Sequence, residues 1–78
     1  MNILIIGAAG GIGTELVSSL SLDNTHHLLL GFHNKPTVSE HESIKLDASN
    51  FDEVENFINT GVERFGKIDA IVNLPGNL

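Results

Sequence analysis

The sequence predicts an α/β fold built on a parallel sheet, because short apolar runs alternate along it with segments of helical period. The runs are continuously apolar, which is typical of strands buried on both faces. The connections are short, and the order is β-α-β-β-α-β. Right-handed crossovers then predict the strand order 3-2-1-4. With 78 residues, residues 1–78 are expected to form one domain or the amino-terminal part of one.

The first half of the chain supplies two strands and a helix. Residues 3–6 form an apolar run that stops at Gly7, which predicts the first strand. From Gly11 the apolar residues recur at helical spacing and predict one buried helix face, formed by Ile12, Leu16, Val17 and Leu20. Polar residues 23–25 end this helix. Residues 28–32 form the second apolar run and predict the second strand.

The second half begins with a polar, non-periodic segment, residues 36–43, which predicts a loop or a single helical turn. Residues 43–46 predict a short third strand. Asn50 and Glu53 have the spacing of a capping box and predict the start of the second helix. An apolar stripe follows at helical spacing: Val54, Phe57, Ile58, Val62 and Phe65. Gly66 stands where a left-handed cap would end the helix.

Residues 68–73 predict a fourth strand, which lies at the edge of the sheet and is stopped by Pro75 and Gly76. An uncovered apolar edge invites pairing with another strand. We therefore expect either self-association of the chain into a homo-oligomer through residues 70–72, or a longer natural protein that covers this edge.

Composition excludes several functional classes. The formal net charge is −6 with only four Lys and Arg residues, so neither a nucleic acid nor a membrane surface is expected as a partner. No apolar run approaches the roughly 20 residues of a membrane span, and no secretion signal is recognisable, so the expected compartment is the cytoplasm. No cysteine is present, and the four histidines lack the spacing of a metal site, so no metal is expected.

The most informative residues are the glycines between the first strand and the first helix. Free N–H groups and the helix dipole make the start of a helix a seat for phosphate, provided that few side chains intervene. Gly7 would permit a tight exit from the strand, Gly11 a close approach of the phosphates, and Gly13 close packing of helix and sheet. An alternative is a glycine-rich turn that binds nothing.

This turn resembles the Rossmann-type dinucleotide-binding turn of the short-chain dehydrogenase/reductase family, whose fingerprint is Gly7-x-x-x-Gly11-x-Gly13 in this sequence. The spacing Gly7-x-x-Gly10-x-x-Gly13 is also present and is similar to that of the extended, epimerase-like branch. The resemblance implies an NAD(P)-dependent oxidoreductase acting on a carbonyl or alcohol substrate. It also implies that the pyrophosphate lies against residues 7–13, including Ala9, Gly10 and Ile12.

The resemblance continues to the end of the chain. Asp47 and Ala48 match the family position that contacts the adenine, although Asp47 could instead cap the second helix. Asn73 and Gly76 match the family's Asn-Asn-Ala-Gly segment and imply contacts on the nicotinamide side. Leu74 and Pro75 depart from that segment and put in doubt the hydrogen bond that the second Asn usually makes between strands.

The end of the second strand bears on the choice of cofactor. A carboxylate there would bind both ribose hydroxyls and repel a 2′-phosphate. Residues 31–35 contain none, and Lys35 or His33 could neutralise a phosphate. NADP is therefore preferred over NAD, with four residues as the expected contacts: Phe32, His33, Asn34 and Lys35.

No catalytic residue is assigned. The family resemblance implies a serine, a tyrosine and a lysine that act on the substrate, and this chain has no tyrosine. We expect the 78 residues to be inactive alone, as the cofactor-binding portion of a larger enzyme. The alternatives are an extended or atypical member of the family, such as a nucleotide-sugar epimerase or a non-catalytic NAD(P) sensor, and a fragment that binds no nucleotide.

Overall fold

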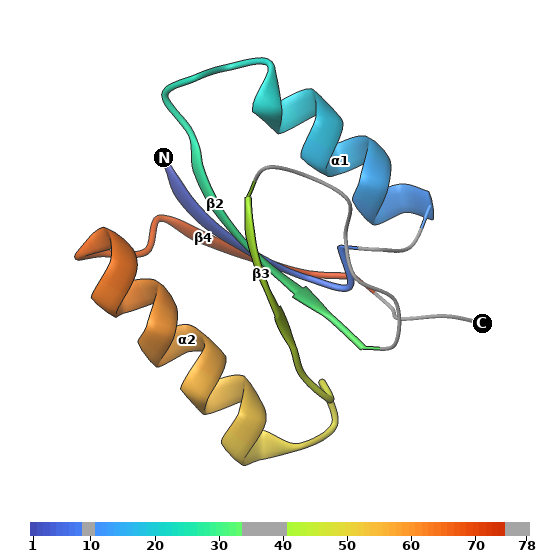
Figure 1. The fold of residues 1–78 in the computed structure, drawn as a ribbon, viewed down its shortest axis with the longest axis vertical. Helices are drawn as coiled ribbons and strands as arrows, with labels where there is room; N and C mark the ends of the chain where they lie inside the picture. Colours follow the sequence, from blue (N-terminus) through green and yellow to red (C-terminus); the bar gives the residue numbers. More distant parts are fainter. Residues whose placement is uncertain (9–10, 34–40, 75–78) are drawn as a thin grey trace.

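The structure is a computed structural model that describes residues 1–8, 11–33 and 41–74. Four parallel strands form one sheet in the order β3-β2-β1-β4, with one helix against each face (Figure 1). In chain order the elements are β1 (Asn2–Ile6), α1 (Gly11–Ser21), β2 (His27–Phe32), β3 (Glu42–Lys45), α2 (Phe51–Phe65) and β4 (Ala70–Asn73). The predicted α/β fold and strand order 3-2-1-4 are confirmed.

The two central strands, β1 and β2, are buried on both faces, which explains why their apolar runs are continuous. On the α1 side, Ile3 and Ile5 of β1 pack with Leu28, Leu30 and Val17. The intervening residues point to the other face, where a second cluster packs under α2: Leu4, Ile6, Leu29, Leu46 and Phe57. Each helix therefore covers its own half of the core.

Helix α1 differs from the prediction at its first turn. Leu16, Val17 and Leu20 face the core as expected, whereas Ile12 is 74% exposed. The buried face is centred near Gly13, which is itself buried. At about 100° per residue, Gly13, Leu16, Val17 and Leu20 lie on one side of the helix. Ile12 lies about 90° around the helix from the middle of that side. The assignment of Ile12 to the buried face was wrong.

Helix α2 begins and ends at the predicted cap residues, but the predicted capping box is only half made, because the Glu53 side chain accepts from the Asp47 N–H instead of the Asn50 N–H. The Asn50 side chain accepts a hydrogen bond from the Glu53 N–H at 3.2 Å, and Gly66, with φ +84°, donates its N–H to the Val62 carbonyl at 2.8 Å. The predicted stripe was wrong at Val62, which is 44% exposed. Gly61 is buried in its place, and a Cβ there would lie 2.7 Å from Leu4 Cδ1. Its lack of a side chain lets α2 approach β1.

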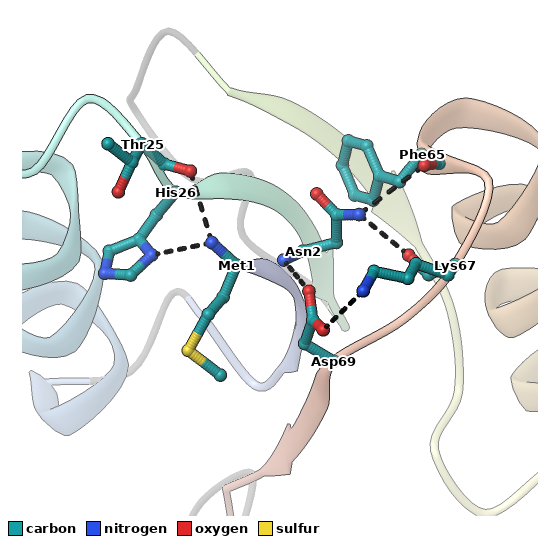
Figure 2. Close-up of polar contacts among 7 residues, drawn as sticks. All are labelled: Met1, Asn2, Thr25, His26, Phe65, Lys67 and Asp69. Atoms are coloured by element: carbon teal, nitrogen blue, oxygen red, sulfur yellow. Dashed lines mark hydrogen bonds and ion pairs between the residues drawn. The ribbon is translucent and has the colours of Figure 1, made fainter.

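The amino-terminal end of β1 is held to the connection between α2 and β4 by polar contacts (Figure 2). The Asn2 N–H donates to Asp69 Oδ2 at 2.7 Å, and Asn2 Nδ2 donates to the Lys67 carbonyl at 2.9 Å. The Asp69 N–H returns a bond to the Asn2 carbonyl at 2.8 Å. Regular pairing in β4 therefore begins at Ala70 rather than at the predicted residue 68.

The third strand spans Glu42–Lys45, one residue earlier than predicted, because Leu46 already leaves the strand after its N–H donates to the Phe32 carbonyl at 2.8 Å. Of the predicted loop 36–43, residues 36–40 lie outside the described ranges. Neither helix in the described part of the chain is long and apolar enough to cross a membrane.

Candidate functional site

The carboxyl ends of the parallel strands meet at one edge of the sheet, and a pocket lies there. Its lining comes from all four strand ends: Ile6, Gly7, Gly31, Phe32, His33, Leu46, Asp47, Ala48, Ser49, Asn73 and Leu74. β1 has β2 on one side and β4 on the other, so the order of the chain reverses at β1. Ligands of open α/β sheets bind in the crevice at such a reversal.

The turn that leaves β1 is tight and needs glycine at its first position. Gly7 has φ +89°, a conformation that residues with a side chain rarely adopt. The N–H groups of Gly7 and Ala8 both donate to the Gly31 carbonyl, at 2.9 and 3.1 Å. A Cβ on Gly7 would lie 2.7 Å from the Leu74 carbonyl oxygen. The fold itself therefore requires Gly7.

The two glycines at the start of α1 differ in what they do for the fold. A Cβ on Gly13 would lie 2.5 Å from the Gly7 carbonyl oxygen and 2.8 Å from Ala8 backbone carbon, so close packing of helix and turn requires Gly13. A Cβ on Gly11 would meet nothing within 4 Å in the described part of the chain. Packing among the described residues therefore does not account for Gly11, which is exposed at the helix start.

Asp47 follows β3 and is held by its neighbours in the chain. Its Oδ1 accepts hydrogen bonds from the Ser49 hydroxyl at 2.6 Å and from the Ser49 N–H at 2.9 Å. The Ser49 hydroxyl is the main reason that the pKa of the Asp47 carboxyl is lowered, with the Ser49 N–H second and the nearby His33 a smaller cause. Asp47 therefore presents a carboxylate to the pocket at neutral pH. It does not cap α2, which Asn50 does.

The pocket brings together six of the residues predicted to bind a cofactor: Gly7, Phe32, His33, Asp47, Ala48 and Asn73. Three more, Gly11, Ile12 and Gly13, form the start of α1 and do not line this pocket. The remaining five lie outside the described residues: Ala9, Gly10, Asn34, Lys35 and Gly76.

Sequence reasoning missed five lining residues: Ile6, Gly31, Leu46, Ser49 and Leu74. A signal was available for Ser49, since an aspartate side chain commonly bonds the backbone two residues further along the chain and serine itself favours turns. Leu74 replaces a family asparagine. Its N–H donates to the Ile6 carbonyl at 2.9 Å, and its side chain packs on the α1 side of the core.

The histidines at the opposite, amino-terminal edge of the sheet have other partners. The Met1 amino group lies 3.2 Å from His26 Nδ1 (Figure 2), and His27 lies against the Phe65 ring. His41 Nε2 lies 2.8 Å from the Ser21 hydroxyl. Among the described residues, no three His, Cys, Asp or Glu side chains are arranged to hold a metal ion.

The chain is similar along nearly its whole length to known oxidoreductases. The family model for short chain dehydrogenases matches residues 1–77. An uncharacterized oxidoreductase of Staphylococcus saprophyticus is 35% identical over 83 residues, which cover 95% of this chain and 33% of that protein. The 3beta-hydroxysteroid dehydrogenase 2 of Eggerthella lenta is 33% identical over 85 residues, covering 94% of this chain and 32% of that protein.

The fold is also shared with solved structures. A Bacillus thuringiensis protein assigned as a 3-oxoacyl-reductase superposes with a TM-score of 0.83 at 18% identity, over 96% of this chain and 36% of that one. The chain spans about a third of the length of the curated relatives that it matches. From the family match and the curated oxidoreductases, the chain belongs to the short chain dehydrogenase family.

Proposed function

We propose that this chain forms the dinucleotide-binding part of an NAD(P)-dependent oxidoreductase. The observation that supports this most strongly is Gly11. Its side of the helix start is open and exposed, so the absence of a side chain serves no contact among the described residues. A glycine costs up to about 1 kcal/mol relative to alanine in a helix. Space for a ligand's phosphates explains why the position is nevertheless bare.

The residues present fit such a cofactor. The first N–H groups of a helix have no partner within the helix, so those of Gly11, Ile12 and Gly13 would bind a pyrophosphate, and the first turn of α1 holds no acidic residue to repel it. Asp47 and Ala48 would hold the adenine end, and Asn73 the nicotinamide end, on the other side of β1. The bound nicotinamide would supply or accept a hydride. The chain's own residues would bind and orient it.

We propose NADP rather than NAD as the cofactor. His33 follows β2 and lines the pocket, where a carboxylate would select NAD. The described residues at the end of β2 place no carboxylate in that position, so a 2′-phosphate would meet no repulsion from them. Asn34 and Lys35, which complete the proposed contacts, lie outside the described ranges.

For the whole protein we propose hydride transfer between the cofactor and a small carbonyl or alcohol substrate. The 3beta-hydroxysteroid dehydrogenase and the uncharacterized oxidoreductase are relatives consistent with this class. The tyrosine expected to act as acid and base has no counterpart in these 78 residues. We therefore expect this segment to bind the cofactor and to be inactive alone.

The test is calorimetric titration of NADPH and NADH into the wild-type chain, Gly11→Ala and Ser18→Ala. Ser18→Ala is the control, since Ser18 is exposed on the same helix and lies outside the pocket. We expect saturable binding, tighter for NADPH. Gly11→Ala should weaken it about tenfold or more, roughly 1.4 kcal/mol, because its methyl group occupies the place of the phosphates. Ser18→Ala should bind like the wild type.

Two results would count against the proposal. One is the absence of saturable binding of either dinucleotide to a folded wild-type chain. The other is unchanged affinity in Gly11→Ala, which would mean that the bare helix start does not receive the phosphates.

A further inference from the structure

The loop that follows β3 holds Asp47 at both its backbone and its side chain. The Asp47 N–H donates to Glu53 Oε1 at 2.9 Å, and its carbonyl accepts from the Asn50 N–H at 2.9 Å. Both partners belong to the start of α2, where the Asn50 side chain in turn accepts from the Glu53 N–H. These contacts with the start of α2 therefore fix the backbone position of Asp47 in the lining of the pocket.

The orientation of the carboxylate depends on a different residue. Ser49 provides both hydrogen bonds to Oδ1, one from its hydroxyl at 2.6 Å and one from its N–H at 2.9 Å. Neither bond uses Oδ2, which accepts no hydrogen bond from the described residues and so has lone pairs for a donor on a ligand. Bonds to a charged acceptor are stronger than those between neutral groups. The Ser49 hydroxyl therefore adds to the Ser49 N–H in restricting the rotation of the Asp47 side chain.

We propose that Ser49 is a positioning residue of the dinucleotide site, which fixes the Asp47 carboxylate so that Oδ2 receives a hydrogen bond from the adenine end of the cofactor. The inference rests on the proposed function and adds to it. Ser49 lines the same pocket as Asp47 and Ala48. The alternative role is a purely local turn, in which the Ser49 bonds stabilise residues 47–50 and no ligand depends on them.

The two roles are separated by comparing ligands that carry the adenine with one that does not. NADPH and reduced nicotinamide mononucleotide are titrated by fluorescence, and adenosine monophosphate is measured by competition with NADPH. The proteins are the wild-type chain, Ser49→Ala, Ser49→Thr and the control Ser18→Ala. Thermal unfolding of each variant, followed by circular dichroism, establishes that it is folded.

We expect Ser49→Ala to weaken NADPH and adenosine monophosphate about 3- to 10-fold, the effect of one hydrogen bond. The affinity for reduced nicotinamide mononucleotide should not change. Ser49→Thr keeps the hydroxyl and should restore binding of the adenine ligands. Since the Ser49 hydroxyl lowers the pKa of Asp47, the acid limb of NADPH binding should also move to higher pH in Ser49→Ala.

Unchanged affinity of a folded Ser49→Ala variant for NADPH would overturn the inference and leave the proposed function standing. An equal loss for all three ligands would also overturn it, because it would show a general disturbance of the site. If the folded wild-type chain bound none of the ligands, the proposed function would fail, and the role of Ser49 with it.

Discussion

Gly7, Gly11 and Gly13 have different roles in the turn between β1 and α1. Gly7 and Gly13 are required by the chain itself, because their missing side chains leave room for backbone atoms of Leu74, Gly7 and Ala8. Gly11 meets no such neighbour among the described residues. The structure bears out two of the three roles that the sequence pattern assigned, the tight turn at Gly7 and the close packing at Gly13. The third role, approach of a phosphate, is the one that the proposed function adds.

Stability measurements on two alanine variants test this division. Gly13→Ala forces a methyl group against the backbone of Gly7 and Ala8, so we expect a loss of about 1–3 kcal/mol in the free energy of unfolding. Gly11→Ala meets open space and gains helix propensity, so its stability should equal or exceed the wild type by up to about 1 kcal/mol. Urea unfolding measures both. Equal destabilisation by the two variants would refute the division.

Asp69 gives a prediction on pH. The Asn2 N–H is the main cause that lowers the pKa of the Asp69 carboxyl below its ordinary value of 3.8. A carboxyl whose folded-state pKa is lowered stabilises the fold above the unfolded value, and this stability is lost as the pH falls through the folded-state pKa. Asp69→Asn keeps a hydrogen-bond acceptor but does not titrate, so the fold should lose less stability as the pH falls.

The measurement is the free energy of unfolding between pH 7 and pH 3 for the wild-type chain, Asp69→Asn and Asp52→Asn. Asp52 is an exposed carboxylate on α2 outside the contact with Asn2. Below about pH 4, the free energy of unfolding of Asp69→Asn should fall less steeply than that of the other two proteins. A slope that matches the wild type would show that the Asn2–Asp69 contact does not stabilise the fold.

At the scale of elements, apolar runs, helical period and caps were enough to predict the order of strands and helices, since the continuous apolar runs of β1 and β2 indicate strands buried on both faces. The helical period of the apolar residues predicted burial less well at the edges of the buried helix faces. Ile12 and Val62 lie on the flanks of their helices, and Gly61 is buried because Leu4 packs against it. Polar contacts distant in sequence, such as Asn2 with Asp69, leave no local pattern by which to predict them.

Helix α2 should depend on its amino-terminal cap. Asn50→Ala removes the side-chain acceptor for the Glu53 N–H and should cost about 1 kcal/mol. Asn59→Ala, at an exposed interior position of the same helix, should leave stability unchanged or raise it slightly through helix propensity. Chemical unfolding of the two variants provides the comparison. If Asn59→Ala cost as much as Asn50→Ala, the cap would have no special role.

At the scale of the whole molecule, the described sheet ends in β4, which pairs with β1 along one side. Ile71 of β4 is 47% exposed. The chain spans about a third of the length of its curated relatives. What covers β4 in the natural protein could not be predicted from these residues. The pocket is different, because all four strand ends that form it lie within this segment.

For the 78-residue chain alone, we expect concentration-dependent self-association through the β4 edge. Ile71→Lys should weaken it by placing a charge beside that edge. Leu22→Lys is the matched control, since Leu22 is 87% exposed and lies outside the sheet. Sedimentation velocity over a range of concentrations measures the effect. A monomer at every concentration, in the wild-type chain, would contradict the expectation.

The central claim is that the start of α1 receives the two phosphates of a dinucleotide. Its most direct test is a titration of NADPH into the ¹⁵N-labelled chain, followed by the backbone amide resonances. The account predicts the largest saturable shifts at Gly11, Ile12 and Gly13, together with shifts at Asp47 and Asn73. Saturable shifts confined to the opposite edge of the sheet, near His26 and Arg64, would contradict it.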